Sequence, residues 1–99
     1  MQLETYLANY EIFNKEFFPD ATVEEIENKM TEECVEFVYE IARNGTRENR
    51  IAEATDVLNM AIKLLRAYGV LDPLHAGYAK LQQTADKYRL VNNGGGKCE

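Results

Sequence analysis

The chain has 99 residues, 45% of them hydrophobic and 28% charged, and a formal net charge of −6 at pH 7, which predicts one globular domain rather than a disordered chain. The negative charge disfavours nucleic-acid binding through a phosphate-neutralising surface, but a nucleotide that arrives with its own divalent cation meets no such obstacle. No apolar run approaches the roughly 20 residues of a membrane span, and the start lacks a signal peptide's basic region, so we expect a cytoplasmic protein without a membrane partner.

The first predicted helix covers about residues 3–18. Four aromatic residues recur along it at helical spacing: Tyr6, Tyr10, Phe13 and Phe17. An aromatic stripe of this kind is more typical of a core or a subunit contact than of a ligand site. Pro19 ends the helix, because the residue before a proline disfavours the α conformation.

The second predicted helix covers about residues 23–43. Thr22 is in position to cap its N-terminus, and Glu25 stands three residues on, as a capping box requires. An apolar stripe follows one side of this helix, and four glutamates gather on a different arc: Glu32, Glu33, Glu36 and Glu40. Taken alone, that acidic arc is typical of a solvated helix face.

The third predicted helix, about residues 47–68, is much more apolar. Ten of the fifteen residues from Ile51 to Leu65 are apolar, so we expect this helix to lie centrally in a bundle. A carboxylate near the interior is costly unless it is paired or bound to a metal. Asp56 therefore calls for either a metal ion or a salt bridge to Lys63, two helical turns away, and we favour the metal.

A fourth helix is predicted to follow Asp72 and Pro73, which suit the N-cap and first helical positions, and to run from about Leu74 to Val91. Lys80, Lys87 and Arg89 make this helix basic, either to complement the helix dipole or to contact phosphates. Residues 1–91 are thus expected to form one all-α domain, followed by a flexible glycine-rich tail over residues 92–99.

Two acidic pairs, each spaced three residues apart, stand on the two central helices. Glu33 and Glu36 form one pair, and Glu53 and Asp56 form the other. If the short connection folds these helices into an antiparallel hairpin, the pairs face each other. Four carboxylates at one spot repel strongly without a cation, and hard oxygen ligands suit Mg²⁺ or Mn²⁺. A zinc site is not expected, because His75 is the only histidine and lies far from either cysteine.

The pattern Glu32-Glu33-x-x-Glu36, followed after a gap by Glu53-x-x-Asp56, resembles the signature of the MazG-like, all-α nucleoside triphosphate pyrophosphohydrolases. The resemblance is good over about residues 22–68. It implies a four-helix bundle completed by oligomerisation, as a homodimer or homotetramer. It also implies a Mg²⁺-dependent enzyme, with Mn²⁺ as a possible substitute, that hydrolyses a (d)NTP to a (d)NMP and pyrophosphate.

Residue by residue, the resemblance assigns metal binding to four carboxylates: Glu33, Glu36, Glu53 and Asp56. Glu32 matches the first acidic position of the signature and could orient water or act as the general base. Lys80, Lys87 and Arg89 are the candidates for gripping the outer phosphates, in the same subunit or from a neighbour.

A non-enzymatic helical interaction module with an acidic face remains the alternative, and it predicts stability that is independent of divalent metal. A ferritin-like di-iron protein is rejected, because that class requires Glu-x-x-His motifs that a chain with His75 alone cannot supply. The base and sugar of the nucleotide are not predicted.

Overall fold

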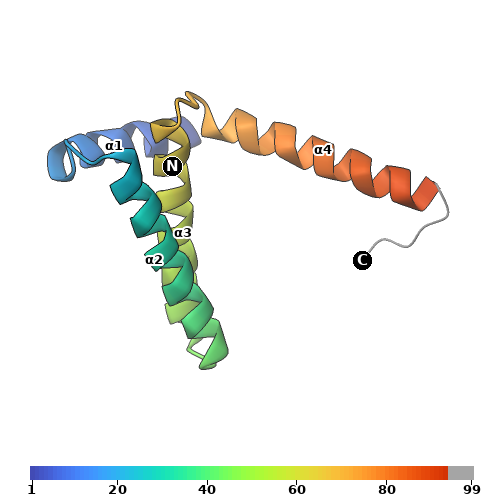
Figure 1. The fold of residues 1–99 in the computed structure, drawn as a ribbon, viewed down its shortest axis with the longest axis horizontal. Coiled ribbons are helices and arrows are strands. Elements are labelled where there is room, and N and C mark those ends of the chain that lie inside the picture. The colour runs from blue at the N-terminus through green and yellow to red at the C-terminus, as the bar shows by residue number, and fades with distance from the viewer. Residues whose placement is uncertain (94–99) are drawn as a thin grey trace.

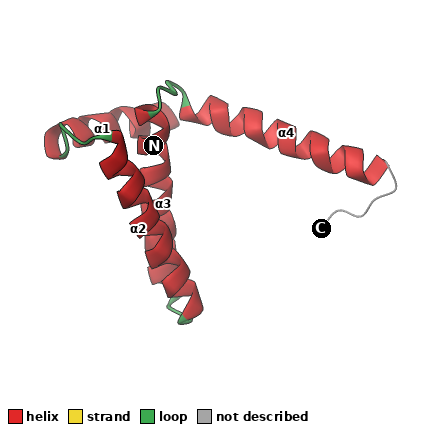
Figure 2. Ribbon diagram, viewed as in Figure 1, coloured by secondary structure: helices red, strands yellow, loops and turns green. Residues whose placement is uncertain are grey.

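The computed structural model describes residues 1–93, and this part of the chain contains four α-helices and no strand. The helices are α1 (Leu3–Phe17), α2 (Val23–Ala42), α3 (Arg47–Ala67) and α4 (Pro73–Asn93), joined by short loops (Figure 2). The all-α, four-helix prediction is confirmed, and the predicted helix ends differ from the observed ones by one or two residues. The remainder of the predicted tail, residues 94–99, lies outside the described residues.

Helices α2 and α3 form an antiparallel hairpin, and both helix ends at their connection are capped (Figure 1). Asn44 takes a left-handed conformation with φ of 57°, and the N–H of Gly45 donates to the carbonyl of Glu40, which closes a Schellman motif at the end of α2. The Thr46 hydroxyl then accepts from the N–H of Asn49 and starts α3. At the other end of α2, the predicted Thr22–Glu25 capping box is present.

The carboxylate of Glu40 further stabilises the connection between α2 and α3. Glu40 is buried and accepts hydrogen bonds from the guanidinium of Arg43, at 2.6 and 3.1 Å, and from the Asn49 amide at 3.3 Å. A Cβ on Gly45 would lie 2.0 Å from Oε1 of Glu40, so only glycine leaves room for that carboxylate. The Arg43 guanidinium, through its hydrogen bonds, holds the pKa of Glu40 below its usual value.

Helix α1 crosses the end of the hairpin where α2 begins and α3 ends (Figure 1). Its attachment to α3 is largely polar. The Tyr6 hydroxyl donates to the side-chain oxygen of Asn59, the Tyr10 hydroxyl donates to the Asn59 carbonyl at 2.6 Å, and Arg66 pairs with Glu11 at 2.9 Å. The predicted aromatic stripe is thus divided, because its two tyrosines are half-buried against α3 while its phenylalanines remain exposed.

Helix α4 projects away from the other three helices (Figure 1). Gly69, with φ of 90°, ends α3 in a second Schellman motif, and the Asp72 carboxylate accepts from the N–H of His75 as the predicted N-cap. Beyond this anchor the apolar stripe of α4 stays largely exposed, with Tyr78 at 63% and Leu81 at 66%. None of the helices in residues 1–93 has an apolar stretch long enough to cross a membrane.

Only two large apolar side chains, Ile26 and Ile62, are buried in the described chain. The expectation that α3 would be central is met only in part. Helix α3 contacts α2 along its length, but Ile51 and Leu58 are about half exposed. A single hairpin leaves the outer side of each helix uncovered, and a two-helix layer has too little depth to bury both sides. Completion of the bundle by a second copy therefore stays a prediction.

Candidate metal centre

Three carboxylates from the hairpin meet where α2 and α3 face each other. Glu33 from α2 and Glu53 and Asp56 from α3 each offer an oxygen, and these atoms all lie within 4.8 Å of one another. The i, i+3 spacing puts Glu53 and Asp56 on the same side of α3, and the short connection aligns that side with Glu33. Glu33 is buried, Glu53 is half-buried and Asp56 is exposed, so the cluster opens toward solvent at Asp56.

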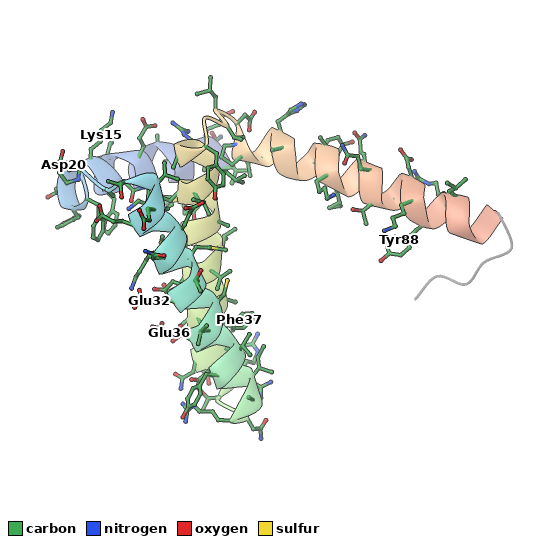
Figure 3. All side chains as sticks on the ribbon, in the orientation of Figure 1. Lys15, Asp20, Glu32, Glu36, Phe37 and Tyr88 are labelled. Carbon is green, nitrogen blue, oxygen red and sulfur yellow. The ribbon has the colours of Figure 1, made fainter. Side chains whose placement is uncertain are left out.

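Glu36 lies beside this cluster, one turn after Glu33. The charge of Glu33, followed by partial burial and the charge of Glu53, raises the pKa of Glu36. Glu36 and Glu32 lie on the side of the hairpin away from α4 (Figure 3). The geometry therefore gathers three of the four predicted ligands and places the fourth within their electrostatic reach.

Two oxygens of the cluster lack partners. Among the described residues, Glu33 Oε2 and Glu53 Oε2 are buried atoms with no hydrogen-bond partner. The other oxygen of Glu33 is engaged, because Lys29 Nζ lies 3.2 Å away, and the hydrogen bond to Glu33 raises the pKa of Lys29. A buried carboxylate oxygen without a donor is unfavourable, and a divalent cation with oxygen ligands would satisfy both atoms. The donor set fits such an ion.

Glu32 stands at the outer edge of this centre. Its side chain is 64% exposed, and its carboxylate pairs with Lys29 at 3.5 Å. Lys29 thus bridges Glu32 to Glu33, so the exposed glutamate is held next to the buried one without joining the three-carboxylate cluster.

Lys63 does not form the salt bridge to Asp56 that is the alternative to a metal ion. In the part of the chain that the structure describes, no ion pair joins Lys63 to Asp56, and its ammonium lies 4.3 Å from the centre of the Phe18 ring. Burial there lowers the pKa of Lys63. Asp56 is therefore left available to a ligand.

A cavity of about 490 Å³ adjoins the cluster between α1, α2 and α3. Glu33 and Asp56 form part of its wall, and its lining also includes Tyr10, Phe13, Asn14, Phe18, Glu25, Lys29, Asn59 and Lys63. A second hollow of about 520 Å³ shares several of these residues and extends toward Lys15 and Arg66. Sequence reasoning missed this cavity, because the crossing of α1 that creates it depends on hydrogen bonds to Asn59 that no periodicity signals.

A model of the phosphoribosyl-ATP pyrophosphohydrolase family matches residues 5–85. The chain belongs to this family. Comparisons with curated proteins and with solved structures gave no match. The family is one of the MazG-like, all-α pyrophosphohydrolases, so the resemblance seen in the sequence is confirmed at that level. Membership makes the chain a pyrophosphohydrolase with a nucleotide substrate.

A nucleotide substrate requires cations that bind its phosphates. Within one chain, the cations predicted for this role lie far from the acidic cluster. Lys80, Lys87 and Arg89 lie on α4, which projects away from the hairpin, and Arg89 pairs with Asp86 at 2.9 Å (Figure 1). The cations near the cluster are instead Lys29 and Lys63. The sequence could have indicated Lys63 as a cation near the cluster, because it lies two turns from Asp56 on the same side of α3.

Proposed function

We propose that this chain is a divalent-metal-dependent nucleotide pyrophosphohydrolase that cleaves between the α and β phosphates, with Mg²⁺ as its ion and Mn²⁺ as a substitute. From a (d)NTP it would release a (d)NMP and pyrophosphate. The observation that carries the proposal is that Glu33 and Glu53, two members of one carboxylate cluster, each have a buried oxygen without a partner in a chain of this family. A basic protein partner would not reach atoms buried between two helices, so the interaction-module alternative is disfavoured.

The position of each residue in the centre supports a separate role for it. Glu33, Glu53 and Asp56 would hold the ion, with Glu36 as an additional ligand at the edge of the cluster. When bound, a divalent ion neutralises phosphate charge and lowers the pKa of a coordinated water. Glu32 is exposed next to Glu33, where it would accept a proton from the attacking water or orient it. Lys29 keeps the two glutamates in register through its ion pairs.

The substrate proposal covers two classes of nucleotide. The family name points to phosphoribosyl-ATP, whereas the acidic signature alone points to a general (d)NTP. Both contain the same α–β phosphoanhydride, and the metal centre contacts only that part of the molecule. The difference between them lies at the base, which has to be tested directly.

We further propose a homodimer or homotetramer in which a second copy covers the exposed apolar stripe of α4. The exposed side chains of that stripe, Tyr78 and Leu81 above all, leave most of this helix without a packing partner among residues 1–93. In this arrangement Lys80, Lys87 and Arg89 would reach the acidic cluster of the partner and bind the outer phosphates. A cytoplasmic location also stays a prediction.

The test is a nucleotide panel that includes phosphoribosyl-ATP and the common (d)NTPs, assayed with Mg²⁺, with Mn²⁺ and with a chelator. Chromatography should show a nucleoside monophosphate and intact pyrophosphate, and no orthophosphate. Asp56→Asn removes one ligand charge and should lower turnover by orders of magnitude, while Asp20→Asn, on an exposed loop, should not. Release of orthophosphate with a nucleoside diphosphate, or full turnover in the chelator, would refute the proposal.

A further inference from the structure

The two carboxylate oxygens of Glu33 differ in their surroundings. The Nζ of Lys29 lies 3.2 Å from Oε1, whereas Oε2 is buried and has no hydrogen-bond partner among residues 1–93. Glu33 is only 7% exposed, so water has little access to this second oxygen. One oxygen of this predicted ligand is thus committed to an ammonium group, and the other remains for a metal ion.

A second carboxylate holds the ammonium group of Lys29 beside Glu33. Glu32 and Glu33 follow Lys29 by three and four residues, so both carboxylates lie within one turn of it on α2, and Oε2 of Glu32 is 3.5 Å from Nζ. The Lys29 side chain is half exposed, and a single exposed ion pair would hold it weakly. Two carboxylates on one ammonium, one of them buried, restrict its position more than a single pair does.

The number of available oxygens on a carboxylate affects which divalent ion it binds best. Mg²⁺ requires near-ideal octahedral geometry at about 2.0–2.1 Å, which a carboxylate meets through one oxygen. Ca²⁺ is larger, takes roughly 6–8 oxygen ligands and often binds both oxygens of one carboxylate. An ion bound to both oxygens of Glu33 would also lie closer to the ammonium of Lys29 than an ion bound to Oε2 alone, and the two positive charges would repel each other.

We propose that Lys29 is a positioning residue that restricts Glu33 to coordination through one oxygen and thereby favours Mg²⁺ over Ca²⁺ at the carboxylate cluster. The inference rests on the proposed function, because it requires the divalent ion that is assigned there to the cluster. Lys29 itself does not bind the ion. It acts through Glu33, by occupying the oxygen that a larger ion would use.

The ratio of the two metal affinities separates this role from a general effect of charge. Loss of any cation near the cluster makes the site more negative and strengthens the binding of both ions, since they carry the same charge. Release of a second carboxylate oxygen favours Ca²⁺ more than Mg²⁺. Lys63 provides the matched control, because it lines the same cavity as Glu33 and forms no ion pair with a carboxylate of residues 1–93.

Calorimetry on the metal-free full chain, titrated with MgCl₂ or with CaCl₂, measures both dissociation constants. Lys29→Met removes the ammonium at nearly constant side-chain length. It should raise the ratio of the Mg²⁺ Kd to the Ca²⁺ Kd by about tenfold, on the order of one hydrogen bond to a charged group. Lys63→Met should strengthen the binding of both ions and leave the ratio unchanged.

Two other substitutions at Lys29 test whether the donated charge is what matters. Lys29→Arg keeps a cation that can donate to Glu33, so it should keep the wild-type ratio. Lys29→Gln keeps only a neutral donor, so it should shift the ratio in the same direction as Lys29→Met but less. The glutamine variant takes the place of the methionine variant if the latter does not fold, as judged by its thermal midpoint in a chelator.

Infrared spectroscopy gives a second readout that does not depend on affinity. The antisymmetric and symmetric stretching bands of a carboxylate lie closer together when both of its oxygens bind one ion than when one oxygen does. The Ca²⁺-loaded Lys29→Met protein should therefore show a carboxylate with a narrower splitting than the Ca²⁺-loaded wild type. Ca²⁺-loaded Lys63→Met should match the wild type.

The outcomes distinguish this inference from the proposed function. A ratio that is unchanged in both Lys29→Met and Lys29→Gln, or that changes equally in Lys63→Met, would overturn the inference and leave the metal centre in place. If neither ion binds the wild type, the metal centre and the inference both fail. If the ratio shifts as expected but no nucleotide is cleaved, the inference stands and the proposed reaction does not.

Discussion

Replacing Glu53 with glutamine should stabilise the metal-free protein and remove much of its response to Mg²⁺. Glu53 has a buried oxygen without a partner and shares a small space with the carboxylates of Glu33 and Asp56. Glutamine has nearly the same shape and no charge, and its NH₂ can donate to either neighbour. The substitution therefore removes repulsion and adds a hydrogen bond where none exists.

The size of the expected stabilisation follows from the distance between the carboxylates. Two unit charges 4.8 Å apart repel by about 0.9 kcal/mol in a water-like medium and by about 3.5 kcal/mol at an effective dielectric of about 20. Because Asp56 is exposed, the lower part of that range applies, and we expect a gain of about 1–2 kcal/mol without metal. Each kcal/mol corresponds to a rise of roughly 4–8 °C in thermal midpoint for a chain of this size.

Thermal and urea unfolding in a chelator, at fixed protein concentration, measure the gain, and a titration with Mg²⁺ measures the response. The wild type should gain about 2.7 kcal/mol when Mg²⁺ reaches a hundred times its Kd, and the Glu53→Gln variant should gain much less. Glu16→Gln, at an exposed position on α1, makes the same change in net charge and should have little effect. Loss of stability in the chelator, or an undiminished Mg²⁺ response, would refute the reasoning.

Three further predictions concern assembly and the α2–α3 connection. Light scattering at micromolar concentration should give a dimer or tetramer mass, and a monomer mass would contradict the proposed role of α4. Gly45→Ala should lower the thermal midpoint, because its Cβ displaces the Glu40 carboxylate, whereas Gly77→Ala, with open space at its Cβ, should not. Arg43 lowers the pKa of Glu40, and Asn49 and Arg50 on α3 lower it further. The contribution of Glu40 to the free energy of unfolding is therefore fully present above the carboxyl pKa of the unfolded chain, and it is lost as the pH falls through the lowered pKa. Acid unfolding of Glu40→Gln should therefore depend less on pH than that of the wild type.

The helices could be predicted from the sequence because their ends carry local signals. Thr22 with Glu25, and Asp72 with Pro73, each act within a few residues, and each pair occurs where it was expected. Packing was harder to predict. The apolar composition of α3 indicated a central helix, but the described chain supplies a neighbour for only part of its surface. Periodicity identifies which side of a helix is apolar without identifying the chain that covers it.

The acidic cluster could also be predicted from the sequence, because its signals are local. Pairs spaced three residues apart on two helices with a short connection have few ways to arrange themselves, and Glu33, Glu53 and Asp56 meet as that geometry requires. The cavity could not be predicted from the sequence. It depends on the angle at which α1 crosses the hairpin, which is fixed by the tyrosine contacts to Asn59. The ammonium of Lys63 in turn lies over the Phe18 ring and forms no ion pair with Asp56, which the spacing of the two residues does not indicate.

The short loop between α2 and α3 has a consequence for folding kinetics. All four proposed ligands lie on this one hairpin, whose contacts are local in sequence and are therefore of the kind that forms early. If the hairpin is already formed in the folding transition state, the repulsion among the carboxylates slows folding more than it speeds unfolding. A cation that relieves the repulsion should then accelerate refolding, and refolding rates measured with and without Mg²⁺ check this expectation.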